Sequence, residues 1–279
     1  AEAARSASTV RQVDLKTVQR HLVETGCLPK EVLAHEDSYP LPRERVAEAV
    51  AHVADGYKDL EVLLAQPDQA LPMLRQAYAD VRDKTARLVY AHVLGMMHDP
   101  AGTDVLVAAV RAAGDWDEGW NYRGMGQFGR SISPLDSYVI ALGRTAAPAA
   151  LAPILEKVAR LDAAAEFSHH RASAMALEAL APALSPAQRK EAAKALAGLL
   201  AQPGMTGHAT TTLDEARRAT GKSRTETVPR NRSLRELILA RALYRLGDHE
   251  GAGERILRTY ANDLRGHYAR HARAVLGGE

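Results

Sequence analysis

The stretch LVYAHVLGMMHDPAGTDVLVAAV, at Leu88–Val110, decides the fold class of this chain. It consists of an apolar segment that ends in Leu-Gly, a short polar turn and a second amphipathic segment. A glycine just past a helix can adopt the left-handed conformation that closes the last turn, and proline is tolerated in the first turn of a helix. Gly95 and Pro100 therefore predict the end of one helix and the start of another. The stretch as a whole predicts a pair of antiparallel helices.

The same pattern recurs at Asp136–Val158 and at Ile238–Tyr260, where Gly143 and Gly247 take the place of Gly95. In the second helix of each pair, the apolar residues recur at the spacing of one helical face. Neither helix can bury such a face alone, so neighbouring pairs must stack on one another. We therefore predict an all-α protein, an α-solenoid of HEAT-like antiparallel helix pairs.

Composition supports helices throughout the chain. Hydrophobic residues make up 46% of the 279 residues, and much of this hydrophobic fraction is alanine. Aromatic residues make up only 5% of the chain. Alanine and leucine favour helices, whereas the β-branched and aromatic runs typical of strands are scarce. We expect an N-terminal helical segment over residues 1–40 and the solenoid over residues 41–279. Helices are predicted at Asp14–Thr25, Leu41–Leu64, Leu71–Tyr78, His170–Leu184 and Pro186–Ala201, the last with Ser185 as its N-cap.

Two long insertions interrupt the predicted array, at about residues 111–135 and 203–233. The first contains GDWDEGWNYRGMGQFGRSISP, and the second is rich in Thr and Arg with a short helix predicted at Leu213–Thr220. Loops of this length within a compact array are usually functional or disordered. The first is too aromatic for a disordered linker, so we expect it to be ordered and packed on the helices.

The first insertion also provides candidate binding residues, because aromatic faces beside charged hydrogen-bonding groups are typical of carbohydrate and nucleobase sites. The candidates are Asp115, Trp116, Asp117, Trp120, Tyr122, Arg123, Gln127, Phe128 and Arg130. The alternative is that the indoles only hold the loop against the helices. The Gly124–Gly129 run matches G-x-G-x-x-G, but it lacks the preceding strand and the directly following helix of a dinucleotide site.

Further candidates come from Ser168-His-His-Arg171, where Ser168 is expected to be a helix N-cap. His169, His170 and Arg171 are candidate ligand or partner contacts, and either histidine is alternatively a purely structural residue. His267 and His271 lie one helical turn apart, but neither the glutamate of a zinc-protease motif nor a third ligand accompanies them, so we predict no metal site.

Charge and motifs limit the functions available. The net charge is +2, so the chain as a whole is not a polyelectrolyte binder. A basic stretch over residues 217–235 would contact phosphates or an acidic partner, or else is a solvated loop. Cys27 is the only cysteine, which excludes an internal disulfide, and we expect it to be buried. No apolar run is long enough to cross a membrane, and no complete catalytic motif is present.

Three segments give the chain a family resemblance. They are VRQVDLKTVQRHL at Val10–Leu22 with the following Gly26 and Leu28-Pro29, the W-D-x-G-W and GMGQFG segments of the first insertion, and the S-H-H-R helix start. Together they resemble the C-terminal helical tail of bacterial FAD-dependent oxidoreductases. The resemblance implies an upstream flavin-binding domain that this chain lacks, so FAD would be bound only in a larger assembly and not by this chain alone. Because the chain starts with Ala, we expect it to be processed or part of a longer protein.

Three functions therefore compete. The first, which we favour, is a non-catalytic helical-repeat binding or scaffold module that pairs with a protein partner or an upstream flavin domain. The second is an enzyme on DNA, similar in fold to the HEAT-repeat DNA glycosylases. The third is a glycan or small-ligand binder that uses the aromatic loop.

Overall fold

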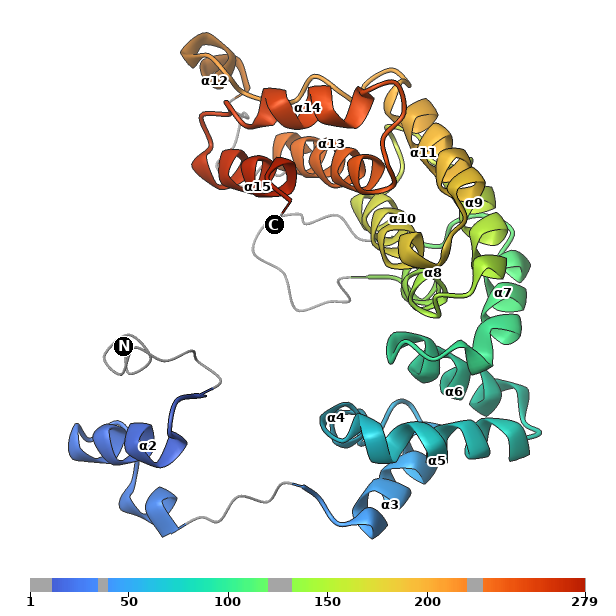
Figure 1. Ribbon diagram of the computed structural model, residues 1–279, viewed down its shortest axis with the longest axis vertical. Helices are drawn as coiled ribbons and strands as arrows, with labels where there is room; N and C mark the ends of the chain where they lie inside the picture. The colour runs from blue at the N-terminus through green and yellow to red at the C-terminus, as the bar shows by residue number, and fades with distance from the viewer. Residues whose placement is uncertain (1–11, 35–39, 120–131, 220–227, 279) are drawn as a thin grey trace. The chain divides into compact units, whose positions relative to one another are not determined.

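The protein is all-helical, as a computed structural model shows for residues 12–34, 40–119, 132–219 and 228–278 (Figure 1). Within these ranges every regular element is a helix and no strand forms. The all-α prediction is therefore confirmed. In the same ranges, no helix combines the length and the apolar character that crossing a lipid bilayer requires. The chain divides into two compact units, Ala1–Pro42 and Arg43–Glu279.

The first unit contains the predicted N-terminal helix, α2 at Leu15–Glu24. The Asp14 side chain accepts a hydrogen bond from the Lys16 backbone N–H at 3.1 Å and so caps the first turn. Gly26 follows the helix with a φ of +72°, a conformation that glycine adopts at little cost. A short 3₁₀ helix, η2 at Lys30–Ala34, completes the described part of this unit. Cys27 is exposed, so the expectation that it is buried is wrong.

The second unit contains all the remaining helices that the structure describes. They are α3 Arg43–Val53, α4 Leu60–Ala65, α5 Pro67–Asp80, α6 Lys84–Met96, η3 Pro100–Gly102, α7 Thr103–Ala112, α8 Pro134–Arg144, η4 Pro148–Ala150, α9 Leu151–Val158, α10 Phe167–Leu180, η5 Ala181–Ala183, α11 Pro186–Leu200, α12 Leu213–Ala219, α13 Val228–Arg245, α14 Ala252–Tyr260 and α15 Gly266–Leu276. The helical stretch predicted at Leu41–Leu64 forms two helices, α3 and α4, separated by a turn over residues 54–59.

These helices pack in two series. Helices α6, α8, α10 and α13 contact one another in that order, and we call them the first row. Helices α7, α9 and α11 also contact one another in order, and we call them the second row. Each helix of the second row follows a helix of the first row in sequence, as Figure 1 shows from α6 to α11. The core between the rows is rich in alanine and leucine, such as the fully buried Ala141, Ala176 and Leu142.

The Leu-Gly repeat has a different role from the one predicted for it. Gly247 lies past the end of α13 with a φ of +99°, as expected of a C-cap. Gly95 and Gly143 instead lie inside α6 and α8, and at both places the prediction is wrong. A Cβ on Gly143 would lie 2.4 Å from the Cα of Ala176 in α10, and one on Gly95 would lie 2.8 Å from the backbone oxygen of Ala141 in α8. These glycines therefore permit close approach between neighbouring helices of the first row.

Local signals set the starts of several helices. Ser185 caps α11 in a reciprocal capping box with Gln188, as the sequence predicts. Ser133 caps α8 in the same way: its Oγ accepts from the Asp136 N–H at 3.0 Å, and the Asp136 carboxylate accepts from the Ser133 N–H at 2.9 Å. The predicted cap at Ser168 is wrong, because α10 begins one residue earlier and Ser168 is buried in its first turn.

Buried acidic side chains hold the described part of the second insertion. The Glu236 carboxylate accepts hydrogen bonds from the backbone N–H groups of Gly207 and His208, at 2.9 and 2.8 Å, and from the Tyr260 hydroxyl at 2.9 Å. The Asp263 carboxylate accepts one from the Thr210 N–H at 2.8 Å. The predicted short helix is α12, and α13 begins at Val228, inside the range predicted as insertion.

Candidate functional site

The described start of the aromatic insertion is held against α9 and α10. The Trp116 indole stacks on the His169 ring, with centroids 4.5 Å apart and planes 20° from parallel, and its N–H donates to the Lys157 carbonyl at 3.1 Å. The buried Lys157 ammonium in turn donates to the backbone oxygens of Gly114 and Asp115, at 3.0 and 3.4 Å. Burial lowers the pKa of Lys157. These contacts satisfy the Trp116 indole N–H and the backbone oxygens of Gly114 and Asp115 from within the protein.

A buried Asp–His pair lies beneath the indole. The His169 Nδ1 donates to the Asp136 carboxylate at 2.7 Å, and its Nε2 faces the Asp117 backbone oxygen at 3.1 Å. The Asp136 carboxylate can only accept, so the proton that joins the pair lies on the His169 Nδ1. Burial by itself raises the pKa of Asp136, but the hydrogen bonds from His169 and Ser133 outweigh burial, and the pKa is lowered.

The remaining described candidates of this region have separate roles. The His170 ring is fully buried, and its two nitrogens lie 3.0 Å from the backbone oxygens of Glu166 and Asp162. Burial lowers the pKa of His170 to about 4, so the ring is neutral at pH 7. Asp117 accepts a hydrogen bond from the Leu135 N–H at 3.1 Å.

The structure thus brings Trp116, Asp117 and His169 together and buries His170 apart from them. Trp120, Tyr122, Arg123, Gln127, Phe128 and Arg130, together with the G-x-G-x-x-G run, lie outside the described residues. A ligand site in the aromatic insertion therefore stays a prediction. A Cβ on Gly119 would lie 2.5 Å from the His169 ring, so this glycine permits the close approach of the loop.

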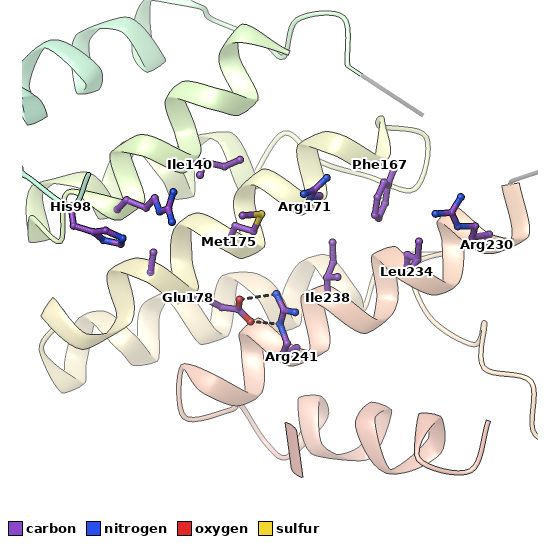
Figure 2. A pocket seen from close by; sticks show the side chains of 12 residues that line it. His98, Ile140, Phe167, Arg171, Met175, Glu178, Arg230, Leu234, Ile238 and Arg241 are labelled. Atoms are coloured by element: carbon purple, nitrogen blue, oxygen red, sulfur yellow. Dashed lines mark hydrogen bonds and ion pairs between the residues drawn. The ribbon is translucent and has the colours of Figure 1, made fainter. Parts of the chain in front are cut away.

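Arg171 belongs to a different place, a groove of about 770 Å³ across helices α8, α10 and α13 of the first row (Figure 2). The groove is lined by His98, Ile140, Arg144, Phe167, Arg171, Met175, Glu178, Ala179, Arg230, Leu234, Ile238 and Arg241. Its volume lies within the range of small-ligand and side-chain binding pockets. Two residues named from the sequence line it: Arg171, and Arg230 of the predicted basic stretch over residues 217–235.

One ion pair crosses the groove. The Glu178 carboxylate on α10 receives two hydrogen bonds from the Arg241 guanidinium on α13, at 2.6 and 2.8 Å, as Figure 2 shows. The Arg245 guanidinium lies 3.7 Å from the same carboxylate. Three other arginines line the groove, and the lone lining carboxylate is neutralised by Arg241 and Arg245.

Two of those arginines are available to a ligand. Arg171 is exposed and makes no hydrogen bond or ion pair with any residue that the structure describes. Within the same part of the chain, the side chain of Arg144 donates one hydrogen bond, to the Met96 sulfur at 3.9 Å, which is a weak acceptor. A guanidinium presents a planar fork of donors that matches a carboxylate or a phosphate.

Sequence reasoning missed the rest of the groove, although a signal for it exists. Phe167, Arg171 and Met175 recur every four residues along α10, so their side chains share one face of the helix. Arg230, Leu234 and Ile238 do the same along α13. An alternation of arginine with large apolar residues on one helical face, in two helices that contact each other, would have indicated the groove.

A second polar cluster joins α6 and α8 to the turn before α4. The His92 ring lies 2.7 Å from both the Tyr57 hydroxyl and the Ser137 hydroxyl, and Tyr57 and Tyr138 pack edge-on against it. Burial lowers the pKa of His92 to about 4 and raises that of Tyr57 to about 12. A serine bonded to an imidazole is one part of a nucleophilic site. Ser137, however, lies inside α8, and its N–H bonds to the Ser133 carbonyl of the helix, so we interpret the cluster as a connection between elements.

Metal ligands do not gather in the part of the chain that the structure describes, where no group of three or more His, Cys, Asp or Glu side chains could hold an ion. His267 and His271 both lie on α15.

Comparison with known proteins yields no match to any family model, any curated protein or any solved structure.

Proposed function

We propose that this chain is a non-catalytic helical-repeat module that binds a protein partner through the groove of its first row. The pairs α6/α7, α8/α9 and α10/α11 are the repeat units of a HEAT-like α-solenoid in this proposal. Two series of helices, each in contact with the next, support it, because stacking of equivalent pairs produces such series. Stacked pairs offer long surfaces on which partners bind.

The observation that carries the proposal is the state of the groove side chains. The polar atoms of Trp116 and His169 bond to the protein itself. Arg171 on the groove is exposed and makes no hydrogen bond or ion pair with the residues that the structure describes. Protein interfaces are enriched in arginine, methionine and aromatic residues around a partly apolar centre. The groove combines these residue types in Arg171, Met175 and Phe167.

The sequence resemblance suggests one kind of partner. A flavin domain of the FAD-dependent oxidoreductase kind would be joined to this chain or would bind it as a separate subunit. In such an assembly the partner holds FAD, and the helical chain supplies a binding surface. This part of the proposal rests on the resemblance alone.

Ala179→Trp tests the proposal, because Ala179 lines the groove and an indole there would fill it. The matched control is Ala187→Trp, at an exposed position on α11 in the second row. The tagged full chain is purified from the cells that express it, and co-purifying proteins are identified by mass spectrometry. Circular dichroism checks that both variants are folded.

We expect one partner to co-purify with the wild type and with Ala187→Trp and to be lost from Ala179→Trp. A partner that Ala179→Trp retains would place the binding surface elsewhere. Recovery of no protein at all by the wild-type chain would contradict the proposed function itself.

A further inference from the structure

Positive charge is concentrated in the groove. Arg144, Arg171, Arg230 and Arg241 line it, against Glu178 as the only carboxylate among the lining residues. The excess of arginines over carboxylates in this one place is larger than the net charge of +2 for the whole chain. An occupant with negative charge would therefore be attracted here more strongly than to an average part of the surface.

The field of these arginines reaches beyond the groove. Desolvation lowers the pKa of His271 on α15, and the positive charges of Arg241 and Arg245 lower it further. The Glu178 carboxylate acts on His271 in the opposite direction, and it is outweighed. Positive potential thus persists around Arg241 even with its ion pair formed.

Apolar side chains alternate with the arginines along each helix. On α10, Phe167 and Met175 flank Arg171 by one turn on either side, and on α13 Leu234 lies one turn from Arg230. One turn of four residues advances about 6 Å along a helix. That distance is close to the spacing of about 6.6 Å between alternate residues of an extended chain, and it also equals one turn of a bound helix.

From this pattern we infer that the occupant is an acidic peptide segment of a partner protein, in which carboxylates lie one helical turn or two extended residues from large apolar side chains. The inference rests on the proposed function and specifies its partner. The carboxylates would pair with Arg171 and Arg144, and the apolar side chains would pack on Phe167, Met175 and Leu234.

Nucleic acid fits the same groove less well. Binding to a phosphate backbone requires a track of charge, and bases stack on aromatic rings. Phe167 is the one aromatic ring in the lining apart from the imidazole of His98, and the other apolar side chains are aliphatic or, in Met175, a thioether. Aliphatic surface beside guanidinium groups is better matched by leucine- or phenylalanine-type side chains next to carboxylates.

The test selects peptides from a random library on the full wild-type chain and measures the affinity of the enriched peptides by fluorescence anisotropy. We expect the enriched peptides to contain more Asp and Glu than the input library, alternating with large apolar residues. We expect Arg171→Glu to weaken their binding at least about tenfold, as loss of a charge-assisted pair does. Lys194→Glu, an equal charge reversal at an exposed position on α11, should leave affinity within about twofold, because it lies outside the groove.

A charge-swapped peptide, with lysine in place of the critical carboxylate, completes the test. It should bind Arg171→Glu better than it binds the wild type, which loss of folding cannot produce. A labelled DNA duplex and a labelled single strand are measured in parallel. If either binds more tightly than the peptides, and loses that affinity in Arg171→Glu, the occupant is nucleic acid and the inference is overturned.

The outcomes separate this inference from the proposed function. If the enriched peptides show no acidic bias but lose affinity for Ala179→Trp, the groove is a binding site and the inference of an acidic occupant is wrong. Peptides whose binding is unchanged in both Arg171→Glu and Ala179→Trp, or a library that yields no binder, would overturn both.

Discussion

Replacing Gly143 with alanine should destabilise the protein although alanine is the better helix former. Gly143 lies inside α8, and a Cβ there would lie 2.4 Å from both the Cα and the backbone oxygen of Ala176 in α10. Non-bonded carbon atoms are most stable at about 3.5–4.0 Å. The overlap is with the backbone of a buried helix, which cannot rotate away as a side chain can. Helices α8 and α10 must therefore separate by about 1 Å to accept the methyl group.

Two terms of opposite sign set the magnitude. Overpacking a core costs roughly 1–3 kcal/mol, and a clash with backbone belongs at the upper end, about 3 kcal/mol. The higher helix propensity of alanine returns at most about 1 kcal/mol. The free energy of unfolding should therefore fall by about 2 kcal/mol.

Gly198→Ala is the matched control. Gly198 lies inside α11, and no atom lies within 4 Å of the position its Cβ would occupy. This substitution should raise the free energy of unfolding by about 0.5–1 kcal/mol, because alanine loses less backbone entropy on folding. The two glycine-to-alanine variants should thus change the free energy of unfolding in opposite directions, and their stabilities should differ from each other by roughly 3 kcal/mol.

Urea unfolding followed by circular dichroism measures both variants, with equal slopes against urea required before midpoints are compared. If Gly143→Ala is as stable as the wild type, the first-row helices do not depend on the close contact, and our account of the Leu-Gly repeat is wrong. If Gly198→Ala is also destabilised by about 2 kcal/mol, the loss of stability in Gly143→Ala cannot be assigned to its clash with α10.

Three further substitutions test the buried polar groups. Asp136→Asn should cost about 2 kcal/mol at pH 7, because the asparagine NH2 cannot accept the hydrogen bond that one carboxylate oxygen takes from His169 or from the Ser133 N–H. Because the pKa of this carboxyl is lowered in the fold, the difference from wild type should shrink below about pH 4 in urea titrations. His170→Gln should remove a pH dependence from the free energy of unfolding. The pKa of His170 is about 4 in the fold, against 6.5 normally, so the wild type keeps its full stability above pH 6.5 and loses up to about 3 kcal/mol as the pH falls to 4. A variant whose stability depends on pH as the wild type does would contradict the neutral buried ring. Glu236→Gln should cost about 2 kcal/mol and speed hydrogen exchange at Gly207, because an amide cannot accept from all three donors; the exposed Glu191→Gln should change stability by less than about 0.5 kcal/mol.

Local signals in the sequence were sufficient to predict that the chain is helical and where several helices start. Ser185 with Gln188, Asp14 before α2 and the Leu-Ala-rich segments all act within a few residues, so their effect does not depend on the rest of the fold. At Gly95 and Gly143 the prediction failed because the backbone of a neighbouring helix competes with the local signal. Gly143 looked like a helix terminator, but the proximity of Ala176 gives it a packing role inside the helix.

For the candidate sites, the sequence identified individual residues but not their contacts. The sequence singled out Trp116 and His169 as unusual residues, but it did not show that they stack on each other and make hydrogen bonds within the protein. It named Arg171 without Met175, Leu234 or the groove that they share.

The sequence by itself determined that this chain is helical and where most helices begin and end, because capping, propensity and apolar periodicity are properties of short segments. Only the tertiary structure decided which residues form a binding surface. Arg144, Arg171 and Arg230 are separated along the chain by tens of residues, and they line one groove because α8, α10 and α13 pack in series. That packing depends on the complementary shapes of whole helices, which no local pattern of residues specifies.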